Sequence, residues 1–263
     1  MRVQLLRLFA AAVILAMAAP PARSALSGPA PTYTAQSIVQ AATQTAEALA
    51  PNTIATIYGS NLAYTTDSAS TKLGGSLPLS LDGVSVIVGG WIANIFYVSP
   101  TQINFLVPYQ LTAGTVNVVV VCQGLAGPEI SVQLNATSPG MFVYNGFAIA
   151  THLDGTLLTA ASPAAPGEII VIYVVGLGRV SPDTTAGRVA TSAATITAAS
   201  QLQVLLAGTP CPPANVLYAG LAPDFAGLYQ INLIVPPLTP PNPEIRIAVG
   251  PQISPPAVIL AAQ

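Results

Sequence analysis

Residues able to do chemistry are scarce in this sequence of 263 residues. The only histidine, His152, lies two residues before Asp154, and residues i and i+2 of a strand share one face. A histidine beside an acid is the base half of a Ser-His-Asp hydrolase, but the sequence contains no G-x-S-x-G string to present a nucleophile. We therefore predict that His152 is an exposed residue at a hairpin tip and that the chain has no catalytic residues.

The nine Asp and Glu residues are isolated from one another in the sequence. Glycoside hydrolases need a pair of carboxyl groups, and zinc sites need three or four close His, Cys or carboxylate ligands. The Asp-Gly pairs at 82–83 and 154–155 are typical of turns, although a calcium site built partly from carbonyl oxygens stays an alternative. We expect neither a metal nor a cofactor.

Aromatic side chains are the remaining candidates for a ligand site. Trp91 follows the pair Gly89-Gly90, and an aromatic ring at a hairpin offers a flat apolar face to a sugar. Tyr97 and Tyr109 are candidate members of the same ligand-binding site. The alternative for Trp91 is that it packs in a core or at a contact between domains.

Composition limits the partners of the chain. Only 6% of the residues are charged, with 7 Lys and Arg against 9 Asp and Glu, whereas about 25% is usual for a soluble domain. A nucleic-acid partner is excluded because phosphate binding needs clustered Lys and Arg. The hydrophobic fraction of 52% argues against intrinsic disorder, so we expect a folded chain whose surface is built from hydroxyl and amide side chains.

The first 24 residues have the layout of a secretory signal peptide. Arg2 and Arg7 precede an apolar run at 8–19, and small residues follow Pro20-Pro21. A run of 12 residues is shorter than the roughly 20 needed to span a bilayer; an uncleaved anchor or a buried helix is the alternative. Cleavage would leave four Lys and Arg against nine Asp and Glu, a net charge of −5. We expect a secreted or cell-surface protein with no transmembrane span in the mature chain.

Cys122 and Cys211 are the only cysteines. An exported chain meets an oxidising compartment, which permits a disulfide. Cys122 ends a strand-like run, however, and Cys211 lies in a Pro-rich hairpin of the other half. Both a disulfide and two buried free thiols are compatible with this spacing.

Three internal matches occur in the same order in the two halves of the chain. The offset between matching strings rises only from 115 to 128, so loop insertions account for the drift. Two copies of one unit of about 100 residues are predicted, and that is the size of a small β-sandwich. The matching ranges are 50–58 with 165–173, 93–97 with 214–218, and 102–108 with 230–236.

Apolar runs inside each copy have the length and β-branched composition of strands. The runs at 84–88 and 91–98 flank Gly89-Gly90, a pair that suits a tight hairpin turn. Segment 36–49 is expected to be extended rather than helical, because it contains Ile38-Val39. The pattern predicts an all-β fold. The other expected strands are 53–58, 102–107, 115–122, 130–136, 168–175, 202–206, 216–218, 229–235, 244–249 and 257–261.

These elements divide the chain into five parts. A connecting hairpin is expected between the two repeats because Asp154-Gly155 separates two apolar runs there. The predicted parts are a signal peptide at 1–24, an N-terminal segment at 25–49, repeat 1 at 50–140, the hairpin at 141–164 and repeat 2 at 165–263.

Long strings in both halves resemble an uncharacterised extracellular domain family that is multiplied in soil acidobacteria of the Solibacter group. Each half also resembles a diverged IPT/TIG domain, which implies two tandem immunoglobulin-like β-sandwich domains. The family has no assigned catalytic or binding residues, and the segment around His152 departs from its Asn-rich spacing. The strings that carry the resemblance lie at 50–62, 84–86 and 96–108, and at 154–155, 162–164, 166–167, 176–178 and 218–232.

The expected function is that of a secreted, non-enzymatic adhesion, scaffold or assembly module whose partner is an extracellular protein or a glycan. The alternative is a carbohydrate-binding module that uses Trp91, Tyr97 and Tyr109. A remote alternative is an envelope glycoside hydrolase. The identity of the ligand, the oligomeric state and the mode of surface attachment do not follow from the sequence.

Overall fold

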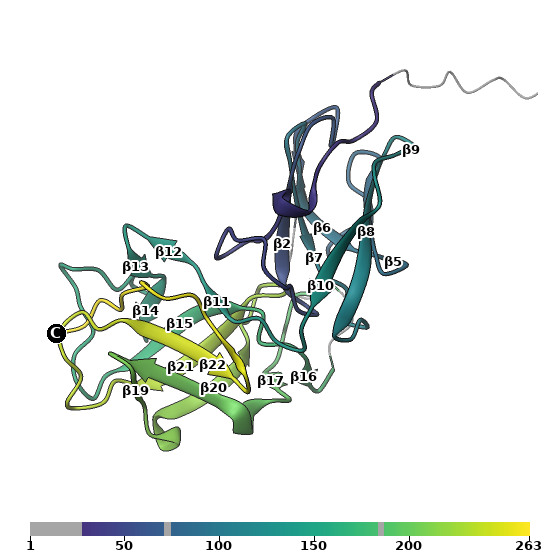
Figure 1. Cartoon of the computed structure of the whole chain (residues 1–263). Coiled ribbons are helices and arrows are strands. Elements are labelled where there is room, and N and C mark those ends of the chain that lie inside the picture. The colour runs from purple at the N-terminus through teal and green to yellow at the C-terminus, as the bar shows by residue number, and fades with distance from the viewer. Residues whose placement is uncertain (1–27, 71–74, 184–186) are drawn as a thin grey trace, which may run out of the picture.

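The computed structural model describes residues 28–70, 75–183 and 187–263, and the predicted signal peptide lies outside the described residues. Two groups of antiparallel sheets follow one another along the chain and form two lobes (Figure 1). The described helices are three short 3-10 turns, at Ala35–Ser37, Ala199–Gln201 and Pro213–Asn215. Across these described ranges, no helix is long and apolar enough to cross a membrane. The predicted all-β fold is confirmed.

Two sheets of the first lobe enclose one core. Their order is β1-β2-β7-β6-β3 in one sheet and β10-β8-β4-β5 in the other, with β9 paired to β8. In β4 the residues Val84, Val86 and Val88 are buried while the intervening residues face outward, as a sandwich strand requires. The strands are β1 (Ile38–Gln40), β2 (Ile54–Tyr58), β3 (Asp67–Ser68), β4 (Val84–Val88), β5 (Trp91–Ile92), β6 (Asn94–Val98), β7 (Gln102–Leu106), β8 (Gly114–Cys122), β9 (Leu125–Ala126) and β10 (Ile130–Leu134).

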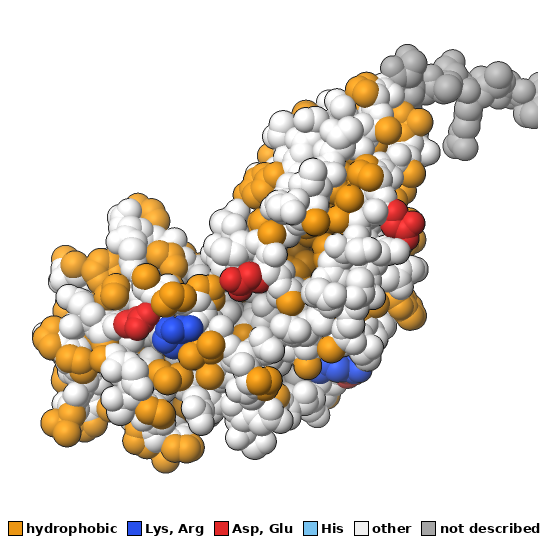
Figure 2. All heavy atoms as spheres, in the orientation of Figure 1, with side chains coloured by type: hydrophobic (Ala, Val, Ile, Leu, Met, Phe, Trp, Pro, Cys, Tyr) orange, Lys and Arg blue, Asp and Glu red, His pale blue; other side chains and the backbone are white. Residues whose placement is uncertain are grey.

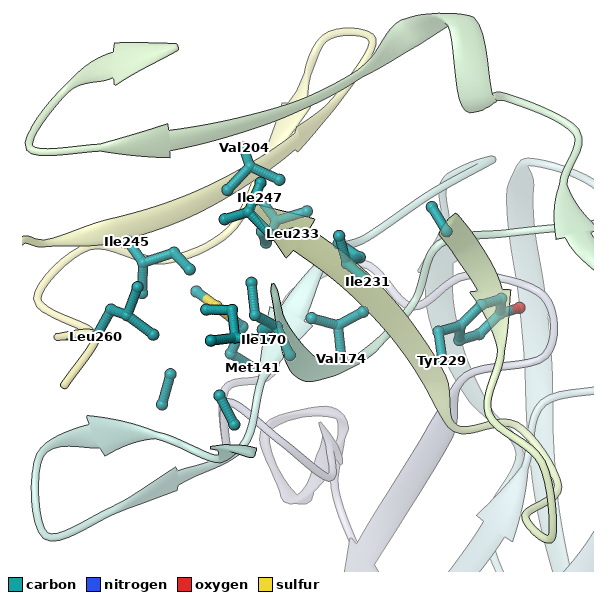
Figure 3. Packing of buried hydrophobic residues seen from close by; sticks show 14 of the residues in the cluster. Met141, Ile170, Val174, Val204, Tyr229, Ile231, Leu233, Ile245, Ile247 and Leu260 are labelled. Carbon is teal, nitrogen blue, oxygen red and sulfur yellow. The ribbon is translucent and has the colours of Figure 1, made fainter. Parts of the chain in front are cut away.

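The second lobe repeats this two-sheet design around a larger core (Figure 3). One sheet has the order β11-β15-β21-β20-β17-β16, with β14 also paired to β15, and the other has the order β19-β18-β22-β23. The strands are β11 (Gly140–Met141), β12 (Val143–Tyr144), β13 (Phe147–Ala148), β14 (Ala150–His152), β15 (Ile169–Val175), β16 (Val180–Ser181), β17 (Thr195–Ile196), β18 (Leu202–Leu206), β19 (Thr209–Pro210), β20 (Val216–Leu221), β21 (Tyr229–Ile234), β22 (Ile245–Val249) and β23 (Gln252–Ile253).

Two strand predictions need correction. The run at 91–98 is two strands, because Trp91–Ile92 pairs with β4 in one sheet whereas Asn94–Val98 pairs with β7 in the other. Segment 257–261 makes only isolated bridges, since Ala257 has a φ of 66° and follows two prolines that donate no backbone hydrogen bond. Only the part of segment 36–49 that forms β1 pairs as a strand.

The segment at 141–164, expected as a connecting hairpin, supplies strands to the second lobe. Both β11 and β14 pair with β15. Met141, Ala148 and Leu158 pack in the second core. The segment is therefore bound along its length to one lobe, rather than forming a free arm between two.

The same irregularity occurs at the same place in both lobes. The pairing of β6 with β7 shifts between Ile95 and Tyr97, and the pairing of β20 with β21 shifts between Val216 and Tyr218. A β-bulge re-aims the side chains that follow it. Tyr97 and Tyr218 thus occupy matching positions, although the first was expected to bind a ligand.

Both cysteine thiols are free and buried. Cys122 ends β8 and packs in the first core, while Cys211 follows β19 and packs in the second core. Of the two alternatives open from the sequence, the structure shows the two buried thiols.

Candidate functional site

A buried tyrosine ties the two lobes together. Tyr229 begins β21 and is fully buried, at the end of the second core shown in Figure 3. Its hydroxyl donates to the carbonyl oxygen of Gly178 and accepts from Asn52 Nδ2 of the first lobe at 3.0 Å. Burial raises the pKa of Tyr229, although the hydrogen bond from Asn52 opposes the shift, so the phenol stays neutral and can donate.

Backbone hydrogen bonds and an apolar cluster reinforce this contact. The N–H of Leu77 donates to Gly187 O, and the N–H of Val189 donates to Gly75 O, each at 2.9 Å. Leu77 also packs with Leu106 and Ala226 in a small buried cluster that belongs to both lobes. Because backbone groups, polar side chains and apolar side chains all cross the contact, the two lobes form a continuous packed body.

The three aromatic residues predicted to form a ligand site lie apart. Trp91 is on β5 of one sheet, and Tyr97 is on β6 of the other sheet. Tyr109 lies beside the contact between the lobes, where the Arg179 guanidinium sits 5.9 Å from the centre of its ring. The sequence identified these aromatic residues as candidates, but it did not predict that they lie on different parts of the fold.

Trp91 is 49% exposed rather than packed in a core. It pairs with Val88 across the Gly89-Gly90 turn. Cross-strand partners share a face of the sheet, and Val88 faces the core, so the indole lies on the inner side of this sheet at its open edge. A partly exposed indole at an open edge is accessible to a ligand.

The outer face of the sheet β10-β8-β4-β5 carries an apolar row beside a polar row. Ile87 lies between Ile92 and Val119 on neighbouring strands. Ser131 Oγ donates to Asn117 Oδ1 at 2.8 Å on the next strand pair. A flat face of this mixed character suits contact with another macromolecule. These outer-face residues occupy every second position of each strand, between the residues that point into the core, so alternation along the strand identifies them in the sequence.

A hollow of about 250 Å³ opens beside the β12–β13 hairpin. Tyr144, 62% exposed, stands on the hairpin, and Leu157, 41% exposed, belongs to the facing segment. We call this cavity the hairpin hollow. It is lined by Tyr144, Asn145, Phe147, Ala148, Ile149, Leu157, Leu158, Thr159, Ala160 and Ala161, which are mostly apolar.

His152 is not the exposed hairpin-tip residue that was predicted; its side chain is 18% exposed. Its Nδ1 lies 2.5 Å from Glu168 Oε1, and its Nε2 lies 3.1 Å from Ser162 Oγ. The hydrogen bond with Glu168 raises the pKa of His152, with desolvation opposing it. Asp154, its expected partner, instead accepts from the Thr156 hydroxyl at 2.7 Å and from the N–H of Thr156 at 2.9 Å, and these two hydrogen bonds lower the pKa of Asp154.

Charged side chains are sparse on the face of the molecule that Figure 2 shows. In the part of the chain that the structure describes, Arg179 forms an ion pair with Asp183 at 2.6 Å, and the contact of His152 with Glu168 becomes a second ion pair when the imidazole is protonated. The described residues also hold no group of three or more His, Cys, Asp or Glu able to bind a metal ion.

Comparison with known proteins supports the fold. The sequence profile of the IPT/TIG domain matches residues 39–138, which span the first lobe from β1 to β10. The immunoglobulin-like sandwich expected for this half is thus confirmed. No curated protein matches the chain.

Several solved structures resemble the chain in outline. SGBP-B of the Bacteroides ovatus mixed-linkage glucan utilization locus, in complex with a mixed-linkage heptasaccharide, is 13% identical with a TM-score of 0.33; the match covers 77% of this chain and 36% of that one. The surface glycan-binding protein PbSGBP-B from Prevotella bryantii is 11% identical with a TM-score of 0.27, covering 85% and 40%. Domains 5–6 of the S-layer protein SbsC are 9% identical with a TM-score of 0.28, covering 89% and 99%. The chain spans about two fifths or less of the first two proteins.

Proposed function

We propose that the chain is an exported scaffold or assembly module, in which two immunoglobulin-like sandwiches present their outer faces to an extracellular partner. The observation that carries this proposal is the contact between the lobes. The lobes are held in one orientation by the hydrogen bond between Asn52 and Tyr229 and by the backbone hydrogen bonds beside Leu77. A fixed orientation lowers the conformational entropy that must be lost when both lobes engage one partner.

The surface chemistry agrees with this role. With few charges, association does not depend on electrostatic steering, and the rows of apolar and amide side chains on the sheet β10-β8-β4-β5 offer a broad contact. The partner that suits such a face is an extracellular protein with a flat, neutral surface.

Two measurements test the proposal. The full chain, expressed in a Gram-negative host, should lose residues 1–24 and be digested by protease added to intact cells or be found in the medium. Small-angle X-ray scattering of the exported protein should fit a single arrangement of the lobes. Retention in the cytoplasm with residues 1–24 intact, or a scattering curve that needs an ensemble of arrangements, would contradict the proposal.

Carbohydrate binding is a second candidate, favoured by the 49% exposure of Trp91 at the open edge of its sheet. A Trp91→Ala variant should bind immobilised β-glucans at least about tenfold more weakly than the natural chain, a loss of about 1.4 kcal/mol. Tyr144→Ala is the matched control, because Tyr144 is an exposed aromatic residue of the other lobe. Equal loss in both variants, or none in either, would remove this candidate.

A further inference from the structure

Three side chains that are distant in the sequence meet at one edge of the second lobe. His152 ends β14, Ser162 ends a tight turn, and Glu168 lies just before β15. The imidazole lies between the other two, with Nδ1 at 2.5 Å from Glu168 Oε1 and Nε2 at 3.1 Å from Ser162 Oγ. This is the order of nucleophile, base and orienting acid that defines a hydrolytic triad by geometry rather than by sequence position.

Each member of the cluster is held by its own backbone contacts. β14 pairs with β15, with His152 opposite Ile170, so the imidazole and the Glu168 side chain lie on the same face of neighbouring strands. The second carboxylate oxygen of Glu168 accepts from the N–H of Ala165 at 2.8 Å. The N–H of Ser162 donates to Thr159 O at 3.1 Å and thereby closes the turn.

The acid determines which imidazole nitrogen is free to accept a proton. Glu168 accepts a hydrogen bond from Nδ1–H, so the Nε2 lone pair of the neutral imidazole faces Ser162 Oγ at 3.1 Å. The carbonyl oxygen of Ser162 lies 3.3 Å from the same nitrogen and accepts from Nε2–H when the imidazole is protonated. Ser162 is exposed, so a substrate can reach its hydroxyl, and the His152 side chain beside it is 18% exposed. We propose that Ser162, His152 and Glu168 form a hydrolytic site for esters of short apolar acyl groups.

The turn that carries the nucleophile also borders an acyl-sized cavity. Thr159, Ala160 and Ala161 lead to Ser162 and line the hairpin hollow, which holds about 250 Å³. Among the described residues, the N–H groups of Ala160 and Ala161 donate no hydrogen bond to the protein. They are therefore free to donate to the oxyanion that forms during ester cleavage.

The reaction needs only the ester and water. Ser162 Oγ forms a bond to the ester carbonyl carbon while its proton moves to His152 Nε2. The carbon–oxygen bond to the leaving alcohol then breaks, and that oxygen takes the proton from Nε2. Water next attacks the acyl-serine, giving its proton to Nε2, and the Oγ–carbon bond breaks to release the carboxylic acid and the reprotonated Ser162. Glu168 is a positioning residue that holds the tautomer and stabilises the imidazolium.

A fluorophosphonate probe tests the nucleophile directly, because it forms a stable adduct with an activated serine hydroxyl. Peptide mass spectrometry of the natural chain should place the adduct on Ser162. Hydrolysis of p-nitrophenyl butyrate should fall by about 10² or more in Ser162→Ala and His152→Gln, the contribution typical of a general base. Ser200→Ala, at an exposed serine of the 3-10 turn at Ala199–Gln201, is the matched control.

The pH profile separates a positioning role for Glu168 from a merely structural one. Hydrolysis needs neutral His152, so the rate should rise with pH through the imidazole pKa, which Glu168 holds above 6.5 while Asp154 adds a smaller effect. In Glu168→Gln the rise should move to lower pH. An adduct on another residue, no adduct on the natural chain, or hydrolysis unchanged in Ser162→Ala would overturn the proposal. The exported scaffold role uses other residues and is unaffected by that outcome.

Discussion

Replacing Tyr229 by Phe should destabilise both lobes, although the change removes one oxygen atom from one of them. Two buried groups lose their partner, namely Gly178 O and Asn52 Nδ2. A buried polar group left unpaired costs about 1–3 kcal/mol, so for two such groups we expect a loss of at least about 2 kcal/mol, or about 30-fold or more in the unfolding constant. Tyr144→Phe, at an exposed position, should leave stability unchanged.

The only tryptophan makes the assay specific to one lobe. Trp91 belongs to the first lobe, whereas far-ultraviolet circular dichroism follows the strands of both. In guanidinium titrations of Tyr229→Phe, both signals should shift to lower denaturant together, because the contact couples the lobes. A shift in circular dichroism with an unmoved Trp91 transition would refute the coupling.

A double-mutant cycle isolates the hydrogen bond across the contact. Asn52 has a φ of 61°, so Asn52→Gly removes its side chain without forcing a strained backbone. The double variant Asn52→Gly/Tyr229→Phe should be less destabilised than the sum of the single variants by about 0.5–1.5 kcal/mol. Additivity to within about 0.5 kcal/mol would mean that the two side chains do not interact.

Three further predictions concern other positions. His152 is the only histidine, so its NMR titration should give a pKa above 6.5 that falls back in Glu168→Gln. The stabilisation of the fold by the contact between His152 and Glu168 should be complete below pH 6.5 and be lost as pH rises through the pKa of His152 in the folded chain. Burial raises the pKa of the Cys211 thiol from 9.0 to about 11. The unfolded chain therefore loses this proton at lower pH than the folded chain, so the free energy of unfolding should fall as pH rises through that range. Thermal unfolding at each pH should show a smaller fall in Cys211→Ala. Both Gly176 and Gly208 have a similar positive φ, but only at Gly176 would a Cβ meet Ser138 O, at 1.8 Å. In chemical denaturation, Gly176→Ala should therefore lower the free energy of unfolding by at least about 2 kcal/mol more than Gly208→Ala. Equal losses in the two variants would contradict this.

Local patterns in the sequence were enough to predict the strands and tight turns. Val84–Val88 and Leu202–Leu206 occur with the predicted bounds, because alternation of apolar residues and flanking glycines are local signals. The prediction of one strand at 91–98 was wrong because the chain passes from one sheet to the other within this run, and both parts have the same apolar composition. Hydrophobic periodicity and β-propensity do not specify which strand a given strand pairs with.

The chemistry around His152 was missed for a related reason. The sequence offered Asp154 as a partner because it is two residues away, but Glu168 is 16 residues away and Ser162 is 10 residues away. The register between β14 and β15 brings His152 beside Glu168, and the turn from Thr159 to Ser162 brings Ser162 to the same place; register is a property of the folded sheet. Tyr109 likewise was placed with Trp91 by residue type alone, whereas the fold sets it against Arg179 at the contact between the lobes.

The scarcity of ion pairs has a consequence for the range of environments that the folded chain tolerates. At low and moderate ionic strength, dissolved salt acts on a fold mainly by screening charges, so its effect there depends on the number of charged contacts that hold the fold together. Two such pairs occur in the described residues, both partly exposed, and one of them is charged only when His152 is protonated. The contact between the lobes uses a phenol, an amide, backbone groups and aliphatic side chains. Raising the ionic strength from about 0.01 M to about 0.15 M, which shortens the Debye length from about 30 Å to about 8 Å, should therefore leave the melting temperature nearly unchanged.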